Sequence, residues 1–249
     1  MQIEAVYQDP NSTFNDMVKI LEKDPLLTAD ILKAANSPLY GFSREINAIS
    51  QAVGLFGMGT VRGFALASIV KKSFPLNLNP YGISNEQFSN LSKYQHALVT
   101  TWYLRKDPKL LGILSPAAFL VEIGKVLIAQ CLSGEDKVGE FRSKMKELGD
   151  VEAAEREICD TDTPEVSASI FDHWRFEPEL IDTIRHCSDP ENAVKEDQVA
   201  AQILHIVRVA VPMNGVMTEE SENAAKALVE KYELDLAGFE KALETMKEE

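Results

Sequence analysis

In this 249-residue chain, Glu122 is the residue whose type and surroundings best fit a metal-binding or catalytic role. It stands in the nearly continuous apolar segment 116–132, where a carboxylate could act as a metal ligand or as a general base. Lys125 follows three residues later, and on a helix this spacing places the two side chains on one face. An ion pair between them, or a buried hydrogen-bonded acid, is the commoner use of such a residue. We therefore favour a structural role for Glu122.

Imidazole and thiol groups give weaker signals. His96 precedes an apolar helical face, where a histidine is more often a hydrogen-bonded core group than a metal ligand. His173 and the pair His186-Cys187 match no zinc-ligand spacing. The three cysteines are far apart and form no CxxC pair: Cys131, Cys159 and Cys187. The sequence predicts no disulfide framework, no metal and no other cofactor.

Motifs and charge argue against several enzyme and binding classes. The chain has no GxGxxG, Walker or GxSxG motif. Its formal net charge is −14, and segment 132–199 alone holds nineteen acidic and eight basic residues, which disfavours contact with nucleic-acid phosphates. Segment 50–72, broken at Gly57-Met58-Gly59, resembles a helix-turn-helix. Its second half is apolar, and Arg62 is the basic residue near the start of that half. We therefore interpret the segment as a core helix rather than a DNA-recognition helix.

Helical patterns dominate the elements that must position these residues. Asp24-Pro25 and Thr163-Pro164 look like helix caps followed by proline, and no alternating strand pattern of useful length occurs. Asn36-Ser37 before Pro38 is interpreted as a turn rather than a binding motif. We predict an all-α protein with helices over these segments: 24–36, 50–56, 60–72, 88–104, 116–132, 138–148, 151–159, 163–174, 178–186, 198–211, 219–232 and 236–249.

No apolar run is judged long enough for a membrane span, and the N-terminus lacks the pattern of a secretory signal. We therefore expect a cytoplasmic location, with no membrane and no nucleic acid among the partners.

The N-terminal part of the chain resembles the HDOD domain of bacterial signalling proteins. The resemblance begins at Asp24-Pro25-Leu26-Leu27-Thr28-Ala29-Asp30-Ile31-Leu32-Lys33-Ala34-Ala35-Asn36-Ser37. It continues through Tyr40-Gly41, Ile46, Ile49, Ala52 and Leu55-Phe56-Gly57-Met58-Gly59-Thr60-Val61-Arg62. A weaker similarity runs on to about residue 190. The resemblance implies an HD-domain-like helical bundle with an N-terminal helical lobe, in three parts: residues 1–88, 89–212 and 213–249.

HD phosphohydrolases, the enzymatic relatives of that family, hold divalent metals with His and Asp side chains. The resemblance places the corresponding positions at His96, Val121, Glu122, Thr163 and His186. Val121 stands where the HDIGK-like pattern has His, although Glu122, Gly124 and Lys125 retain its other features. Val121 cannot coordinate a metal, and Thr163 replaces an expected His. The surviving set is too small for a catalytic metal centre.

The resemblance implies a non-catalytic regulatory module of bacterial signal transduction that binds a protein partner. A small ligand in the ancestral cleft is a further possibility. We expect that cleft to be lined by His96, Glu122, Lys125, Thr163, His186 and Cys187. Two alternatives stay open: a metal-dependent phosphohydrolase with a divergent site, and a DNA-binding regulator. The oligomeric state and the partner are not predicted.

Overall fold

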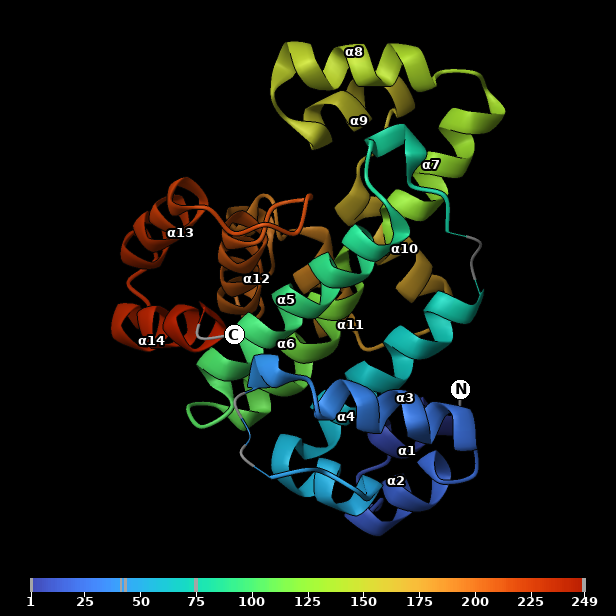
Figure 1. Ribbon diagram of the computed structural model, residues 1–249, viewed down its shortest axis with the longest axis vertical. Helices are drawn as coiled ribbons and strands as arrows, with labels where there is room; N and C mark the ends of the chain where they lie inside the picture. The colour runs from blue at the N-terminus through green and yellow to red at the C-terminus, as the bar shows by residue number, and fades with distance from the viewer. Residues whose placement is uncertain (1, 41, 43, 74–75, 248–249) are drawn as a thin grey trace.

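The protein is built from helices joined by short connections (Figure 1). The structure, a computed structural model, describes residues 2–40, 42, 44–73 and 76–247. Gly41, which belongs to the family-like motif, lies outside the described residues. The described part of the chain contains no β-strand, and this confirms the predicted all-α class.

The N-terminal elements are α1 (Gln2–Gln8), α2 (Phe14–Leu21), α3 (Pro25–Ala35), the 3-10 turn η1 (Pro38–Tyr40) and α4 (Ile49–Ser73). The middle elements are η2 (Asn79–Tyr81), α5 (Asn85–Tyr103), α6 (Pro108–Leu120), η3 (Val121–Ile123), α7 (Gly124–Gly134), α8 (Val138–Leu148), α9 (Val151–Cys159), α10 (Thr163–His173) and α11 (Pro178–Arg185). The C-terminal elements are η4 (Pro190–Asn192), α12 (Gln198–Ala210), α13 (Glu219–Lys231) and α14 (Leu236–Lys247).

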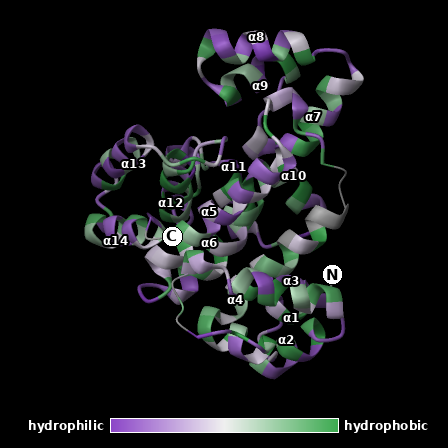
Figure 2. Ribbon diagram, viewed as in Figure 1, coloured by the Kyte–Doolittle hydropathy of each residue, from purple (hydrophilic) through white to green (hydrophobic). Residues whose placement is uncertain are grey.

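Two clusters of buried apolar side chains divide the molecule into lobes. The smaller cluster draws its buried residues from Ile3 to Ala65, and the larger one from Leu66 to Met246. The boundary between the two clusters therefore lies within α4. The first half of α4 lies with α1–α3 at one end of the molecule (Figure 1). α8 and α9 lie at the opposite end. Apolar and polar residues alternate along the helices (Figure 2), and the buried positions are mostly apolar.

α4 bends at the predicted break. Gly57 has φ 81° and ψ 163°, a conformation that a side chain would strain. Beyond the bend, Val61, Phe64 and Ala65 are buried, which confirms the interpretation of this segment as a core helix. Arg62 is fully buried as well. The early basic residue of the segment is therefore inaccessible to a DNA backbone.

The central apolar segment differs from the prediction. We predicted one helix over 116–132, but α6 begins at Pro108 and contains Pro116 in its interior, so the predicted start is wrong. The cap is Asp107, whose side chain accepts a hydrogen bond from the Leu110 N–H. The helix is then interrupted by η3. There the Ser167 hydroxyl, from α10, donates to the Val121 carbonyl at 2.7 Å and accepts from the Gly124 N–H at 2.8 Å.

The apolar stretch Pro108–Gly134 is long and apolar enough, by length and composition, to cross a membrane. Our expectation that no stretch reaches that length is therefore wrong. Of the relevant window, 83% is buried inside the protein. This burial is the pattern of a core helix, since a membrane-spanning helix needs its apolar surface for lipid.

A buried arginine joins the two lobes. Arg62 on α4 donates to both carboxylate oxygens of Glu4 on α1, at 2.9 and 3.0 Å. It also pairs with Glu177, the residue before α11. Its guanidinium lies 4.1 Å from the centroid of the Tyr7 ring. One fully buried cation thus connects α1 and α4 with the start of α11, and two carboxyl groups face it.

Close backbone contact between α4 and α6 depends on glycine. A Cβ on Gly59 would lie 2.5 Å from the Gly112 Cα, whereas a Cβ on Gly54 would meet nothing within 4 Å. We expect Gly59→Ala to destabilise the fold by about 1–3 kcal/mol through overpacking. We expect Gly54→Ala to leave stability unchanged or to raise it by about 0.5–1 kcal/mol. Chemical denaturation of both variants measures the difference, and equal stabilities would contradict the close contact.

Candidate functional site

Lys125 lies at the centre of a buried charge network. Its ammonium, on α7, is 2.8 Å from Glu122 Oε2 and 3.9 Å from Glu155 Oε1, and it donates to the Thr163 hydroxyl at 3.1 Å. The Lys125 side chain is only 3% exposed, and those of Glu122 and Glu155 are 4% and 0% exposed. The ion pair that the i, i+3 spacing predicts for Glu122 and Lys125 is therefore present. It is enclosed by protein.

Glu122 has two further donors. Arg208 on α12 donates to Glu122 Oε1 at 2.9 Å, and Gln95 on α5 donates to the same oxygen at 3.2 Å. The other side of the Arg208 guanidinium lies 2.6 Å from Glu152 Oε1. Glu122 thus connects η3 with α5, α7 and α12. Its carboxylate oxygens accept from two cationic groups and one amide.

Glu155, on α9, is held by three short hydrogen bonds. It accepts from the Tyr81 hydroxyl at 2.7 Å, from the Thr163 N–H at 2.6 Å and from the Thr163 hydroxyl at 2.7 Å. Thr163 can donate to Glu155 through its N–H because Asp162, rather than Thr163, is the N-cap of α10. The predicted cap at Thr163 is thus wrong. Because Thr163 is the first helical residue, its N–H has no partner within the helix and is available to Glu155.

Charge and burial act in opposite directions on the two acids. Burial by itself raises the pKa of Glu122, but the charges of Arg208 and Lys125 outweigh it and hold that pKa far below its usual value. Burial raises the pKa of Glu155, and the more distant Lys125 with the hydrogen bonds from Thr163 and Tyr81 does not offset it. Burial lowers the pKa of Lys125, but Glu122 and Glu155 outweigh this and raise it. Lys125 therefore stays charged.

Gly124 allows the two helices of the site to meet. A Cβ at this position would lie 2.4 Å from the Thr163 carbonyl oxygen and 2.9 Å from the Ser167 hydroxyl. The backbone of α7 therefore approaches the start of α10 more closely than any other residue type permits. This approach brings Lys125 within reach of Thr163.

His96 lies apart from this network, at the contact between the lobes. Its Nδ1 is 2.5 Å from the Tyr40 hydroxyl, and its Nε2 is 2.8 Å from the Ser115 hydroxyl. Its ring stacks on Phe119, with centroids 3.9 Å apart. Burial holds the pKa of His96 well below its usual value, so the imidazole is neutral. These contacts confirm the role that we favoured for His96, that of a hydrogen-bonded histidine in the core.

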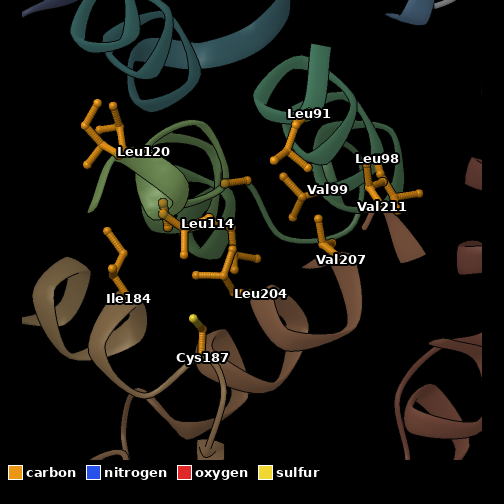
Figure 3. Packing of buried hydrophobic residues seen from close by; sticks show 14 of the residues in the cluster. Leu91, Leu98, Val99, Leu114, Leu120, Ile184, Cys187, Leu204, Val207 and Val211 are labelled. Atoms are coloured by element: carbon orange, nitrogen blue, oxygen red, sulfur yellow. The ribbon is translucent and has the colours of Figure 1, made fainter. Parts of the chain in front are cut away.

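The pair His186-Cys187 is divided between surface and core. His186 is half-buried and lies 3.5 Å from Asp182 Oδ1, away from the carboxylates of the network. Cys187 is fully buried beside Ile184 and Leu204 (Figure 3), and burial raises the pKa of its thiol to about 11. Arg208 lies 3.2 Å from its sulfur and so links Cys187 to Glu122.

Of the six candidate residues, the structure brings together Glu122, Lys125 and Thr163 directly, and Cys187 through Arg208. His96 and His186 lie elsewhere, and Val121 contributes only its backbone carbonyl. Sequence reasoning missed these members: Tyr81, Gln95, Glu152, Glu155 and Arg208. Arg208 carried a usable signal, because a single charged residue in an apolar helix needs a buried partner.

Fold and site together define a helical protein of the HD-like type, whose central position holds a buried network of ion pairs. The HDOD domain model matches residues 1–190, and the chain belongs to the HDOD domain family. This confirms the resemblance seen in the sequence and its end near residue 190, and it extends the match from Asp24 back to residue 1. No curated protein matches significantly.

Several solved structures share the fold. A virulence factor from Campylobacter jejuni is 25% identical with a TM-score of 0.63, and the alignment covers 99% of this chain and 93% of that one. A candidate phosphohydrolase from Shewanella amazonensis is 22% identical with a TM-score of 0.69, covering 98% and 89%. A candidate signal transduction protein from Marinobacter aquaeolei is 20% identical with a TM-score of 0.71, covering 98% of this chain and 55% of that one.

The metal centre of HD phosphohydrolases can be tested against the residues present. Metal-binding carboxylates and imidazoles must offer lone pairs to the cation. Here the lone pairs of Glu122 and Glu155 already accept from an ammonium, a guanidinium, a phenol and a threonine. Among the described residues no group of three or more His, Cys, Asp or Glu side chains could hold a metal. The residues of the network do not fit a divalent metal.

Removal of the central cation should be costly. We expect Lys125→Met to destabilise the protein by about 3–5 kcal/mol, because two buried carboxylates lose their shared ammonium. Lys137→Met is the matched control. Its ammonium pairs with Glu135 at 2.6 Å, but its side chain is 41% exposed, so we expect the variant to unfold close to wild type. Urea unfolding at pH 7 measures both, and a small effect of Lys125→Met would contradict the central role of this ion pair.

The buried imidazole should make stability depend on pH. Because the pKa of His96 is lowered in the folded state, the unfolded chain binds its proton more readily. Stability should therefore fall as the pH drops below the unfolded pKa of about 6.5, by at most about 1.4 kcal/mol per pH unit from this group.

The measurement compares wild type with His96→Gln in urea between pH 5 and 8. The variant should have lower stability at pH 8 and a shallower decline toward pH 5. His173→Gln, on the exposed end of α10, controls for the loss of an imidazole. Parallel pH profiles for wild type and His96→Gln would show that His96 does not titrate as described.

Proposed function

We propose that this protein is a non-catalytic regulatory module that acts by binding a partner. The observation that carries the proposal is the position of the Lys125 ammonium between Glu122 and Glu155. A group that is already positively charged occupies the centre of the carboxylate pair. A metal-activated water, which hydrolysis of a phosphate ester by an HD-type enzyme requires, would need those same oxygens.

Burial supports the same proposal. Glu122, Lys125 and Thr163 are 3%, 2% and 0% exposed, so a substrate could reach them only if helices separated. Val121, in the HDIGK-like segment, is an apolar side chain at 0% exposure. The residues that resemble an active site now serve to hold α5, α7, α9, α10 and α12 together. A module of this kind transmits information by association rather than by turnover.

The family and its structural relatives support a role in signalling. The Marinobacter protein with the same fold is named as a candidate signal transduction protein, whereas the Shewanella protein is named as a candidate phosphohydrolase. Two classes of function are therefore represented on this fold. The buried ammonium favours the first class for this chain. We propose another protein as the partner, as the family resemblance implies.

Metal analysis and activity assays test the proposal together. We expect the purified protein, after incubation with Mn²⁺, Fe²⁺ or Zn²⁺ and gel filtration, to retain substoichiometric metal. We expect no hydrolysis of p-nitrophenyl phosphate, bis-p-nitrophenyl phosphate or cyclic nucleotides above the rate of a Glu122→Gln variant. Stoichiometric metal, together with hydrolysis that Glu122→Gln abolishes, would establish a phosphohydrolase instead. Mass spectrometry and catalytic assay thus separate the two classes.

A further inference from the structure

The buried arginine between the lobes faces more acid than one positive charge can neutralise. Arg62 donates to both oxygens of Glu4, at 2.9 and 3.0 Å, and it also donates to both oxygens of Glu177. The Arg62 side chain is fully buried, and those of Glu4 and Glu177 are 7% and 17% exposed. If both acids were ionised, one negative charge would therefore stay uncompensated away from water, which is unfavourable.

The two acids contact each other as well as the arginine. A side-chain hydrogen bond joins the carboxyl groups of Glu4 and Glu177. Because an ionised carboxylate can only accept, a hydrogen bond between two carboxyl groups requires one proton. With that proton in place, one guanidinium faces one carboxylate and one neutral acid. The cluster is then free of excess charge.

Glu4 is the acid that carries the proton. Burial raises the pKa of Glu4 to about 7, because Arg62 lowers this pKa only in part and Glu177 raises it further. Burial also raises the pKa of Glu177, but the hydrogen bonds and the charge of Arg62 outweigh it and lower that pKa. Two uncharged groups lie nearby. The Gln8 amide donates to Glu4 at 2.9 Å, and burial raises the pKa of Tyr7, which therefore stays neutral.

The cluster fastens α1 to the rest of the protein. Glu4 and Tyr7 both lie on α1, and the Tyr7 ring lies 4.1 Å from the Arg62 guanidinium. A Cβ on Gly59 or on Gly112 would lie 3.2 or 2.8 Å from the Tyr7 hydroxyl, so this hydroxyl covers the crossing of α4 and α6. α1 has seven residues, which is too short for a helix that is stable by itself. Its position therefore depends on these contacts.

We propose that Glu4, Glu177 and Arg62 form a proton-operated latch, in which loss of the shared proton weakens the attachment of α1 to α4 and to the start of α11. Without the proton, two carboxylates in contact repel each other inside the protein. The pKa of Glu4 is raised only while α1 is attached, so attachment is strongest below about pH 4.5 and weakens as the pH rises to about 7. The latch involves neither a metal nor a partner, so it holds or fails independently of the proposed function.

Hydrogen exchange of the whole chain, followed by mass spectrometry, tests the latch. After correction for the intrinsic effect of pH on exchange, we expect the α1 amides to open about ten- to thirtyfold more often at pH 7.5 than at pH 5.5, as a pKa raised from 4.5 to about 7 requires. The α12 amides, in the core of the second lobe, should open much less often than those of α1. This difference would show that α1 separates locally.

Two variants of the acids separate the latch from a merely structural contact. Glu4→Gln imitates the protonated acid, so its α1 amides should open roughly tenfold less often than those of wild type at pH 7.5, with little dependence on pH. Glu177→Gln removes one cause of the raised pKa of Glu4 and should reduce the pH dependence. It also keeps the test valid if Glu4→Gln does not fold. Glu22→Gln, which removes an exposed acid of the same lobe, should behave like wild type.

Two results would overturn the proposal. The first is opening of wild-type α1 that does not change between pH 5.5 and 7.5. The second is a folded Glu4→Gln protein whose α1 opens as often as that of wild type at pH 7.5, or more often, because a purely structural role of Glu4 predicts that outcome.

Discussion

The ammonium of Lys125 is the charge on which the second lobe depends. Two carboxylates from η3 and α9 face it inside the protein, where neither could stay ionised without a nearby cation. A buried ion pair adds little net stability compared with apolar packing, but it enforces one geometry because any displacement leaves a charge uncompensated. The network therefore fixes the relative positions of α7, α9 and α10. The glycine at 124 and the threonine at 163 make that geometry possible.

Local signals in the sequence were sufficient for much of this arrangement. The pairing of Glu122 with Lys125 follows from helical spacing, and Asp24 caps α3 as its position before proline predicts. The break in α4 follows from Gly57, whose positive φ few other residues tolerate. Each of these features depends on residues within four positions of one another. Such features can be derived from sequence because local helix geometry determines which residues meet.

Features that depend on distant residues could not be derived in this way. The helix predicted over 116–132 is interrupted because Ser167, more than forty residues away, takes the backbone groups of Val121 and Gly124. The sequence singled out His96, but one helical step of about 100° separates it from Gln95, which contacts Glu122. Glu155 and Arg208 meet the network from α9 and α12. Only the packing of these helices brings them to one place.

The turn η3 lies between the ion-pair network and the space between the lobes. Glu122 in this turn belongs to the ion-pair network, whereas its neighbour Ile123 and the preceding Leu120 line that space. Ser167 holds the turn from behind through its two hydrogen bonds. Ion pairs that fix η3 from one side therefore also fix the position of the apolar side chains on its other side.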